Sequence, residues 1–264
     1  LSCYGNPKLT TPNLDEVASQ GVLFRNAFSS SPWTLPSHAS MFTGLYPSEH
    51  GATQQNLKLR DDLPVIAELL GEAGYTTFSL SANGWISKAH GLTRGFDVAF
   101  EADDFWHSYP LRILNRLSGY RLYREGLIKR RTVRIFETAL SLLQGKRQPF
   151  FMFINLMDAH LPYKPLPAYR HFVDAQHRER MWEVNQDAAR YITGLYEMQP
   201  EDFEILRALY LGEIAGMDFQ IGNFLEDLKA SALDKNLVTI IVADHGENIG
   251  DHKLMDHQLS LHDT

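Results

Sequence analysis

Residues 150–160 read FFMFINLMDAH, and residues 237–247 read LVTIIVADHGE. Each stretch opens with a run of seven residues that, apart from Asn155, are aromatic, aliphatic or β-branched, a length typical of a strand buried on both faces and short for a helix. Acidic and imidazole side chains follow directly, namely Asp158, His160, Asp244 and His245. Open α/β sheets usually form their binding sites where strands end. The two stretches therefore predict a mainly parallel sheet with functional residues at its edge.

The rest of the chain alternates predicted helices and strands. We expect helices from Asn13 to Gly21, from Asp61 or Asp62 to Gly74, over roughly 105–144, and over 200–230 as one long helix or a helix pair. Further strands are expected over 22–28 and 75–80. This alternation favours an α/β fold, a mainly parallel sheet sandwiched by helices. No repeat interrupts the pattern, so residues 1–264 are expected to form one domain.

The composition excludes several classes of protein. A chain of 264 residues that is 44% hydrophobic can bury a large core. Its net charge of −7 argues against nucleic acid as a partner, and no apolar run approaches the roughly 18 residues of a transmembrane helix. The lone cysteine, Cys3, excludes an internal disulfide. Basic residues gather between 121 and 134, either on a solvated helix face or in contact with an anionic substrate or lipid.

A third stretch, SPWTLPSHASMFTG over residues 31–44, predicts a short helix. Pro36 suits its first turn and Gly44 its end. Thr34 would then lie at the helix N-terminus, where N–H groups without helical partners stabilise an alkoxide or hold an anionic ester oxygen. Thr34 is therefore a candidate nucleophile, and an ordinary N-cap threonine is the alternative.

Asp244 and His245 are candidate metal ligands. A carboxylate beside an imidazole at a strand end is a typical pair of ligands for a divalent ion, and Gly246 lets the backbone pass close to it. His160 stands in a loop that Pro162 holds extended. It is either a loop histidine bonded to the backbone or a group that acts on the substrate.

Taken in order, these stretches resemble the sulfatase family of the alkaline phosphatase superfamily. Thr34 stands where the family's activation signature has Cys or Ser, and His38 stands where it has Arg. Other matching stretches are LSCYG (1–5), TPNLD (11–15), TGLYPSEHG (43–51), HLPY (160–163), IAGMD (214–218) and DHGE (244–247). The resemblance covers nearly the whole chain and is weakest over residues 101–147.

This resemblance implies a metal-dependent ester hydrolase. A divalent ion would be held by Thr34, Asp244 and His245, with Mn²⁺ or Zn²⁺ favoured by the imidazole and Ca²⁺ as the third candidate. Bound metal would lower the pKa of the Thr34 hydroxyl, which then attacks the substrate. His160 would contact the transferred group or protonate the leaving oxygen. His257, near the position of a family lysine, is expected to share that leaving-group role.

The departures from the family pattern bear on the substrate. Sulfatases convert the Cys or Ser to formylglycine, and threonine is not a known substrate for that conversion. The family's Gly-Lys-Trp-His segment falls near residues 82–86, where neither charged group is present, so Asn83 and His38 become the candidate substrate contacts. A threonine nucleophile with an Asp-His pair is typical of phosphodiesterases and phosphoglycerol transferases of the superfamily. His252 or His257 could also serve a second metal.

Several alternatives stay open at this point. The favoured activity is phosphoryl transfer from a small-molecule, lipid or sugar ester. A sulfuric ester hydrolase, a non-catalytic pseudo-enzyme or ligand-binding domain and, less favoured, a phosphosugar mutase are the others. The resemblance also leads us to expect an upstream metal-ligand strand and a C-terminal subdomain outside residues 1–264, without which the chain is expected to be inactive. Localisation, cytoplasmic or exported, and oligomeric state are left open.

Overall fold

The computed structural model describes residues 1–107, 121–145 and 149–258. These residues form two compact units. The sheet unit comprises Phe28–Met157 and Thr239–His245, and the long-helix unit comprises Leu1–Ala27, Asp158–Val238 and the described part of Gly246–Thr264. The expectation of one domain over residues 1–264 stays a prediction.

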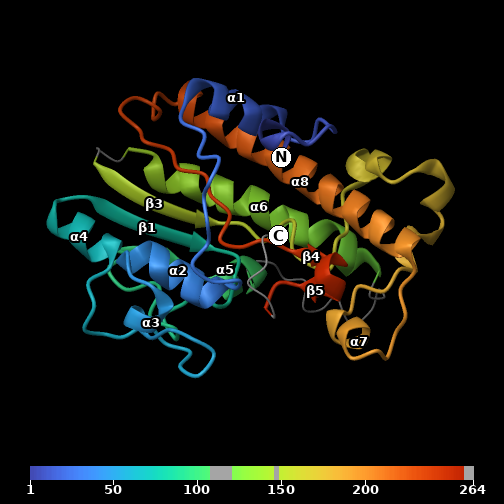
Figure 1. The fold of residues 1–264 in the computed structure, drawn as a ribbon. Helices are drawn as coiled ribbons and strands as arrows, with labels where there is room; N and C mark the ends of the chain where they lie inside the picture. The colour runs from blue at the N-terminus through green and yellow to red at the C-terminus, as the bar shows by residue number, and fades with distance from the viewer. Residues whose placement is uncertain (108–120, 146–148, 259–264) are drawn as a thin grey trace. The chain divides into compact units, whose positions relative to one another are not determined.

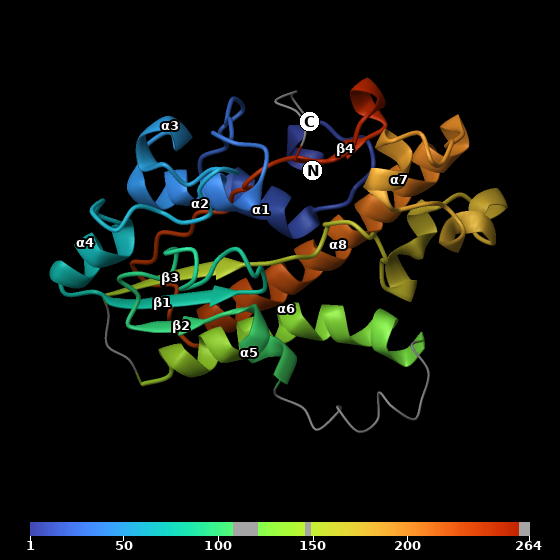
Figure 2. The same cartoon turned by 90° about the horizontal axis from the view of Figure 1, so that it is seen from below.

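The sheet unit is built on a three-stranded parallel sheet of order β2-β1-β3; Figure 1 labels β1 and β3, and Figure 2 labels all three strands. Its strands are β1 (Thr76–Ser81), β2 (Val98–Phe100) and β3 (Phe150–Asn155). β1 lies in the centre, where Phe78 pairs with Val98 on one side and with Met152 on the other. The positions of β1 and β3 confirm the strands predicted over 75–80 and 150–156.

Helices cover both faces of this sheet. The helices of this unit are α2 (Thr34–Thr43), α3 (Pro47–His50), which packs on α2, α4 (Ile66–Glu72), α5 (Ala102–His107) and α6 (Arg121–Leu143). Figure 2 shows α2 and α4 on one face and α5 and α6 on the other. Phe153 of β3 meets Phe42 of α2 edge to face, with ring centroids 4.9 Å apart. The predicted α/β fold, a mainly parallel sheet sandwiched by helices, is confirmed.

The long-helix unit is organised around α8 (Pro200–Ala230), a single helix of 31 residues. Its other elements are α1 (Pro12–Gln20), α7 (Ala188–Ile192), β4 (Asn248–Ile249), β5 (Met255–Asp256) and the short 3-10 helices Ser2–Tyr4, Pro167–Phe172, Ala175–His177, Arg180–Trp182 and Asp251–Lys253. Leu206 and Leu209 of α8 pack with Tyr163, Ile249 and Met255 in its core.

A carboxylate on α8 caps α1, which lies alongside it (Figure 1). Asp218 accepts hydrogen bonds from the main-chain N–H groups of Asn13 and Leu14, at 3.2 and 2.8 Å, and from the Asn13 amide at 2.8 Å. The first N–H groups of a helix have no partner within it, so this buried aspartate takes the part expected of an N-cap side chain. The predicted helix is confirmed, although its cap comes from α8.

Two predicted strands are wrong. Residues 22–28 and 237–243 join no ladder among the described residues, and Val22, Val238 and Ile240 are 79%, 83% and 81% exposed. Both segments have the composition of a strand, but a strand forms only where a neighbour supplies ladder hydrogen bonds, which composition does not encode.

Two helix boundaries also differ from the prediction. α4 begins at Ile66 rather than at Asp61 or Asp62, because a residue before proline is pushed out of the helical region and Pro64 follows Leu63. The helix predicted over 105–144 is represented by α5 and α6, and residues 108–120 of it lie outside the described residues. Each described helix is too short or too polar to cross a bilayer.

The contact of α8 with α1 leads to a stability prediction. A Cβ on Gly222 would lie 2.3 Å from Asn13 Oδ1, and Asn13 is held by its bond to Asp218. Gly222→Ala should lower the free energy of unfolding by about 1–3 kcal/mol. In Gly71→Ala the new Cβ would meet no atom within 4 Å, so this helical control should be neutral or stabilising. Equal losses of unfolding free energy in the two variants, measured by denaturant titration, would contradict the contact.

The environment of His50 predicts a pH dependence of stability. The Ala52 N–H donates to the buried His50 Nδ1 at 3.1 Å, and burial lowers the pKa of the imidazole below its ordinary 6.5. On acidification through pH 6.5 the unfolded chain takes up a proton before the folded chain does, so stability present above that pH is lost below it. Melting temperatures between pH 7.5 and 5 should fall less in His50→Gln than in the parent protein; parallel curves would refute this.

Candidate active site

Thr34 is the first residue of α2 and is 3% exposed. The chain enters the helix from Trp33, whose φ of −152° and ψ of 163° are extended. The Thr34 Oγ1 accepts a hydrogen bond from Asn83 Nδ2 at 3.1 Å. The Asn83 Oδ1 in turn accepts the N–H of Trp85 at 2.9 Å, which directs the amide NH₂ group toward Thr34. The hydroxyl is thus buried, at a helix N-terminus, with a donor aimed at its oxygen.

Two serine hydroxyls hold Asp244 against α2. Ser37, in the first turn of the helix, donates to the main-chain carbonyl of Asp244 at 2.7 Å, and Ser29 donates to the same carbonyl. The two hydroxyls also lie 3.1 Å apart. The segment 239–245 therefore reaches the helix through side-chain hydrogen bonds.

His38 connects Asp244 with Thr34. Its Nδ1 lies 2.9 Å from the carbonyl oxygen of Thr34 and 3.6 Å from Asp244 Oδ2. Because a carbonyl only accepts, Nδ1 carries the proton in the first contact. Burial lowers the pKa of His38, and the nearby Asp244 carboxylate opposes that effect in part. A buried imidazole of this kind favours its neutral form.

The pair of Asp244 and His245 has the spacing of two ligands of one cation. Asp244 Oδ2 lies 3.3 Å from His245 Nε2. Two ligands about 2.1 Å from a tetrahedral ion are roughly 3.4 Å apart, so a carboxylate and an imidazole at this distance fit a divalent metal. The sheet unit brings together Thr34, His38, Asn83, Asp244 and His245 through the contacts above. Their chemical roles stay predictions.

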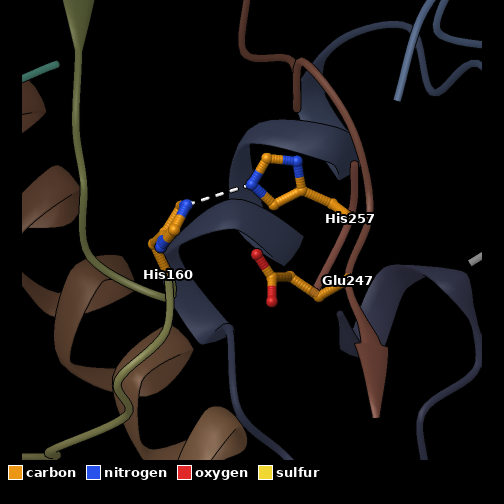
Figure 3. A group of neighbouring side chains, drawn as sticks. All are labelled: His160, Glu247 and His257. Carbon is orange, nitrogen blue, oxygen red and sulfur yellow. Dashed lines mark hydrogen bonds between the residues drawn. The ribbon is translucent and has the colours of Figure 1, made fainter. Parts of the chain in front are cut away.

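The other predicted residues belong to the long-helix unit. His160 and His257 meet there with their Nε2 atoms 3.1 Å apart, and Glu247 completes a group whose ligand atoms all lie within 4.8 Å of one another (Figure 3). His252, the alternative considered for a second metal, lies on the exposed 3-10 helix Asp251–Lys253. It is not part of the group found among the described residues.

A tyrosine holds the Glu247 carboxylate. The Tyr163 hydroxyl donates to Glu247 Oε2 at 2.8 Å. Burial raises the pKa of Tyr163, and the adjacent carboxylate raises it further, so the phenol stays a donor. The same two causes raise the pKa of Tyr210 to about 12.

Sequence reasoning missed four contributors: Ser29, Ser37, Tyr163 and Glu247. The two serines act on a main-chain carbonyl more than 200 positions away in the sequence, for which a single sequence carries no signal. Glu247 stands in the same stretch as the predicted metal ligands, which was a usable signal.

Comparison with known proteins identifies the class. The family model for Sulfatase matches residues 1–263, and this chain belongs to the sulfatase family, as its motifs indicated. It is 24% identical over 298 residues to the uncharacterized sulfatase YidJ of Escherichia coli, covering 100% of this chain and 57% of that protein. It is 25% identical over 305 residues to mouse iduronate 2-sulfatase, covering 96% and 53%. The chain thus spans about half the length of these relatives.

Solved structures share the fold. The phosphonate monoester hydrolase of Agrobacterium radiobacter has a TM-score of 0.75 at 21% identity, over 98% of this chain and 61% of that one. The C-terminal periplasmic domain of EptC from Escherichia coli, solved in complex with zinc, has a TM-score of 0.62 at 19% identity, over 97% and 63%. At these identities the likeness supports the α/β architecture alone, and the substrate has to be inferred from the residues of the site.

Proposed function

We propose that this chain carries the catalytic centre of a divalent-metal-dependent ester hydrolase with Thr34 as nucleophile and with phosphate-type esters as preferred substrates. Membership of the sulfatase family supports ester hydrolysis. The observation that carries the assignment to Thr34 is its buried hydroxyl, which receives a hydrogen bond from Asn83. His38, one turn further along α2, contacts both the Thr34 carbonyl oxygen and the Asp244 carboxylate.

The residues of the site suit an attacking alkoxide. Thr34 Oγ1 lies at the positive end of α2, and the Asn83 amide donates to that oxygen, so both favour negative charge on it. A divalent ion held by Thr34, Asp244 and His245 would further lower the pKa of the hydroxyl. Attack forms a bond from Oγ1 to phosphorus and breaks the bond to the leaving alcohol, whose oxygen takes up a proton. Water or an acceptor alcohol then releases the phosphoryl group from Thr34.

The choice of phosphate over sulfate follows from the single oxygen of threonine. A formylglycine hydrate carries two hydroxyls, so it can expel a bound sulfate by rebuilding its aldehyde. An ester on Thr34 must instead be cleaved by attack at phosphorus or sulfur, which is the ordinary course of in-line phosphoryl transfer. Hydrolysis of sulfate esters is the second candidate, because relatives such as mouse iduronate 2-sulfatase are sulfatases by name.

The first test uses the full-length protein with p-nitrophenyl phosphate, bis-p-nitrophenyl phosphate, a phenylphosphonate ester and p-nitrophenyl sulfate, each with Mn²⁺, Zn²⁺ or Ca²⁺. Thr34→Ala should lower kcat/KM by at least roughly 10³-fold, and Thr34→Ser should keep part of the activity, because it keeps a hydroxyl. Thr43→Ala removes a hydroxyl that bonds Ala39 at the other end of α2 and should leave the rate unchanged.

Each contrary outcome has a definite meaning. Unchanged activity in Thr34→Ala would show that Thr34 is not the nucleophile and would favour a binding domain. Faster turnover of the sulfate ester than of every phosphorus ester would favour the second candidate.

The role of Asn83 gives a further prediction. Asn83→Ala should lower kcat by about 10²-fold with little change in KM, because the lost donor serves the charge that develops on Thr34 Oγ1. Asn83→Asp should lower kcat more, since a carboxylate cannot donate and repels the alkoxide. Asn56→Ala removes an exposed amide that bonds main-chain carbonyls and serves as control. A kcat within twofold of the parent value in Asn83→Ala would show that its contact is only structural.

A further inference from the structure

We propose that Ser81 is a positioning residue of the candidate active site, because its hydroxyl holds the turn that presents the Asn83 amide to Thr34. Ser81 is the last residue of β1, at the carboxyl end of the parallel sheet, where open α/β sheets usually form their sites. The effect of Ser81 on the rate rests on the function proposed for Thr34, whereas its effect on the Asn83 amide does not.

One face of β1 carries three buried hydroxyls, although strands of a parallel sheet that are buried on both faces are usually apolar. The hydroxyls belong to Thr77, Ser79 and Ser81, each 0% exposed and each two positions from the next, so they share a face. Ser79 pairs in register with Phe153, whose ring meets Phe42 of α2. The three hydroxyls therefore lie on the side of the sheet that α2 covers (Figure 2).

Thr77 and Ser79 differ from Ser81 in their contacts. The Thr77 Oγ1 donates to the Gly95 carbonyl at 2.9 Å and lies 3.2 Å from Asp97 Oδ2, so it connects β1 with the residues that precede β2. The Ser79 Oγ has no hydrogen-bond partner within the part of the chain that the structure describes. Ser79 is thus a matched reference for Ser81, with the same side chain on the same face of the same strand.

The Ser81 hydroxyl fixes the start of the turn that carries Asn83. Its oxygen accepts the main-chain N–H of Asn83 at 3.0 Å. Its proton has two acceptors within reach, the Asn83 carbonyl and Asn155 Oδ1, each 3.2 Å away, and it bonds one of them at a time. Asn155 pairs with Ser81 at the end of β3, so the ends of two strands hold the turn.

The other hydrogen bonds of the turn direct the Asn83 amide. The Asn83 Oδ1 accepts the N–H of Trp85 at 2.9 Å, and its main-chain carbonyl accepts the N–H of Ile86 at 3.0 Å. Ile86 is 0% exposed and packs in the same core cluster as Leu35, the neighbour of Thr34. Loss of the Ser81 hydroxyl would free the start of the turn and leave its end packed. The Asn83 Nδ2, which donates to Thr34 Oγ1 at 3.1 Å, would then lose its fixed position.

Removing the Ser81 hydroxyl should therefore lower the rate through Asn83. A misplacement of about 1 Å can cost about 10²-fold in rate, so Ser81→Ala should lower kcat about 10-fold. KM should stay within twofold, because the charge on Thr34 Oγ1 develops only in the transition state. Ser81→Cys fills the same space with a weakly bonding thiol and should behave like Ser81→Ala. Ser79→Ala should keep kcat within twofold of the parent value.

A double-mutant cycle separates positioning from general damage to the fold. It uses the full-length protein and the ester of the first test that this protein hydrolyses fastest. If Ser81 acts only through Asn83, the double variant Ser81→Ala/Asn83→Ala should match Asn83→Ala in kcat within twofold, whereas independent effects would multiply. Multiplied effects overturn the proposal, and so does a kcat in both Ser81 variants within twofold of the parent value.

A second readout needs no activity, so it distinguishes failure of this proposal from failure of the proposed function. With asparagine labelled with ¹⁵N in its side chain, the NH₂ signals of Asn83 are identified by their loss in Asn83→Ala. In Ser81→Ala and Ser81→Cys these signals should shift and exchange with solvent at least about 10-fold faster, and in Ser79→Ala they should not change. If Thr34→Ala leaves hydrolysis unchanged while the signals respond to Ser81, the nucleophile is wrong and the positioning stands. Signals that are unchanged in both Ser81 variants overturn the positioning.

Discussion

The main-chain carbonyl of Asp244 accepts hydrogen bonds from Ser29 and Ser37, and the candidate active site depends on this anchor. Residues 239–245 have no ladder among the described residues, and these two hydroxyls, together with the contact of His38 Nδ1 with Asp244 Oδ2, hold Asp244 beside α2. A hydrogen bond between neutral groups contributes only about 1 kcal/mol. The position of the metal-ligand pair thus depends on a few weak contacts, while Thr34 is set by the packed helix itself.

Local signals predicted the elements that carry Thr34 and the sheet. Pro36 and Gly44 set the limits of α2, and Gly44 indeed ends it with a φ of 72°. The runs that became β1 and β3 are short and contain aromatic or β-branched residues, and the run of β3 is also largely apolar. Each of these signals acts within a few residues, which is why a single sequence shows them. The grouping of Thr34 with Asp244 followed from the family resemblance, since nothing local connects positions so far apart.

The wrong and missing predictions share one cause: each feature depends on residues that are far apart in the sequence. Residues 22–28 and 237–243 have the composition of strands. A strand forms only beside a neighbouring strand, however, and the residue pattern does not identify that neighbour. β4 and β5 have two residues each, too few for a period of two to be recognised. Without that hairpin, the approach of Glu247 to His257 could not be inferred. The serine contacts to Asp244 were hidden for the same reason.

The turn between β4 and β5 is exposed, yet both its glycine and its length are constrained. Gly250 has a φ of 87°, and a Cβ there would lie 2.7 Å from the ring of Phe203, so glycine is required by both backbone and packing. The length of the turn is equally fixed. Gaining or losing one residue between Ile249 and Met255 would slip the pairing and rotate one strand's side chains to the opposite face. Exposed loops usually tolerate changes in length. This loop is held to one length, because the approach of Glu247 to His257 at the other end of the two strands depends on their register.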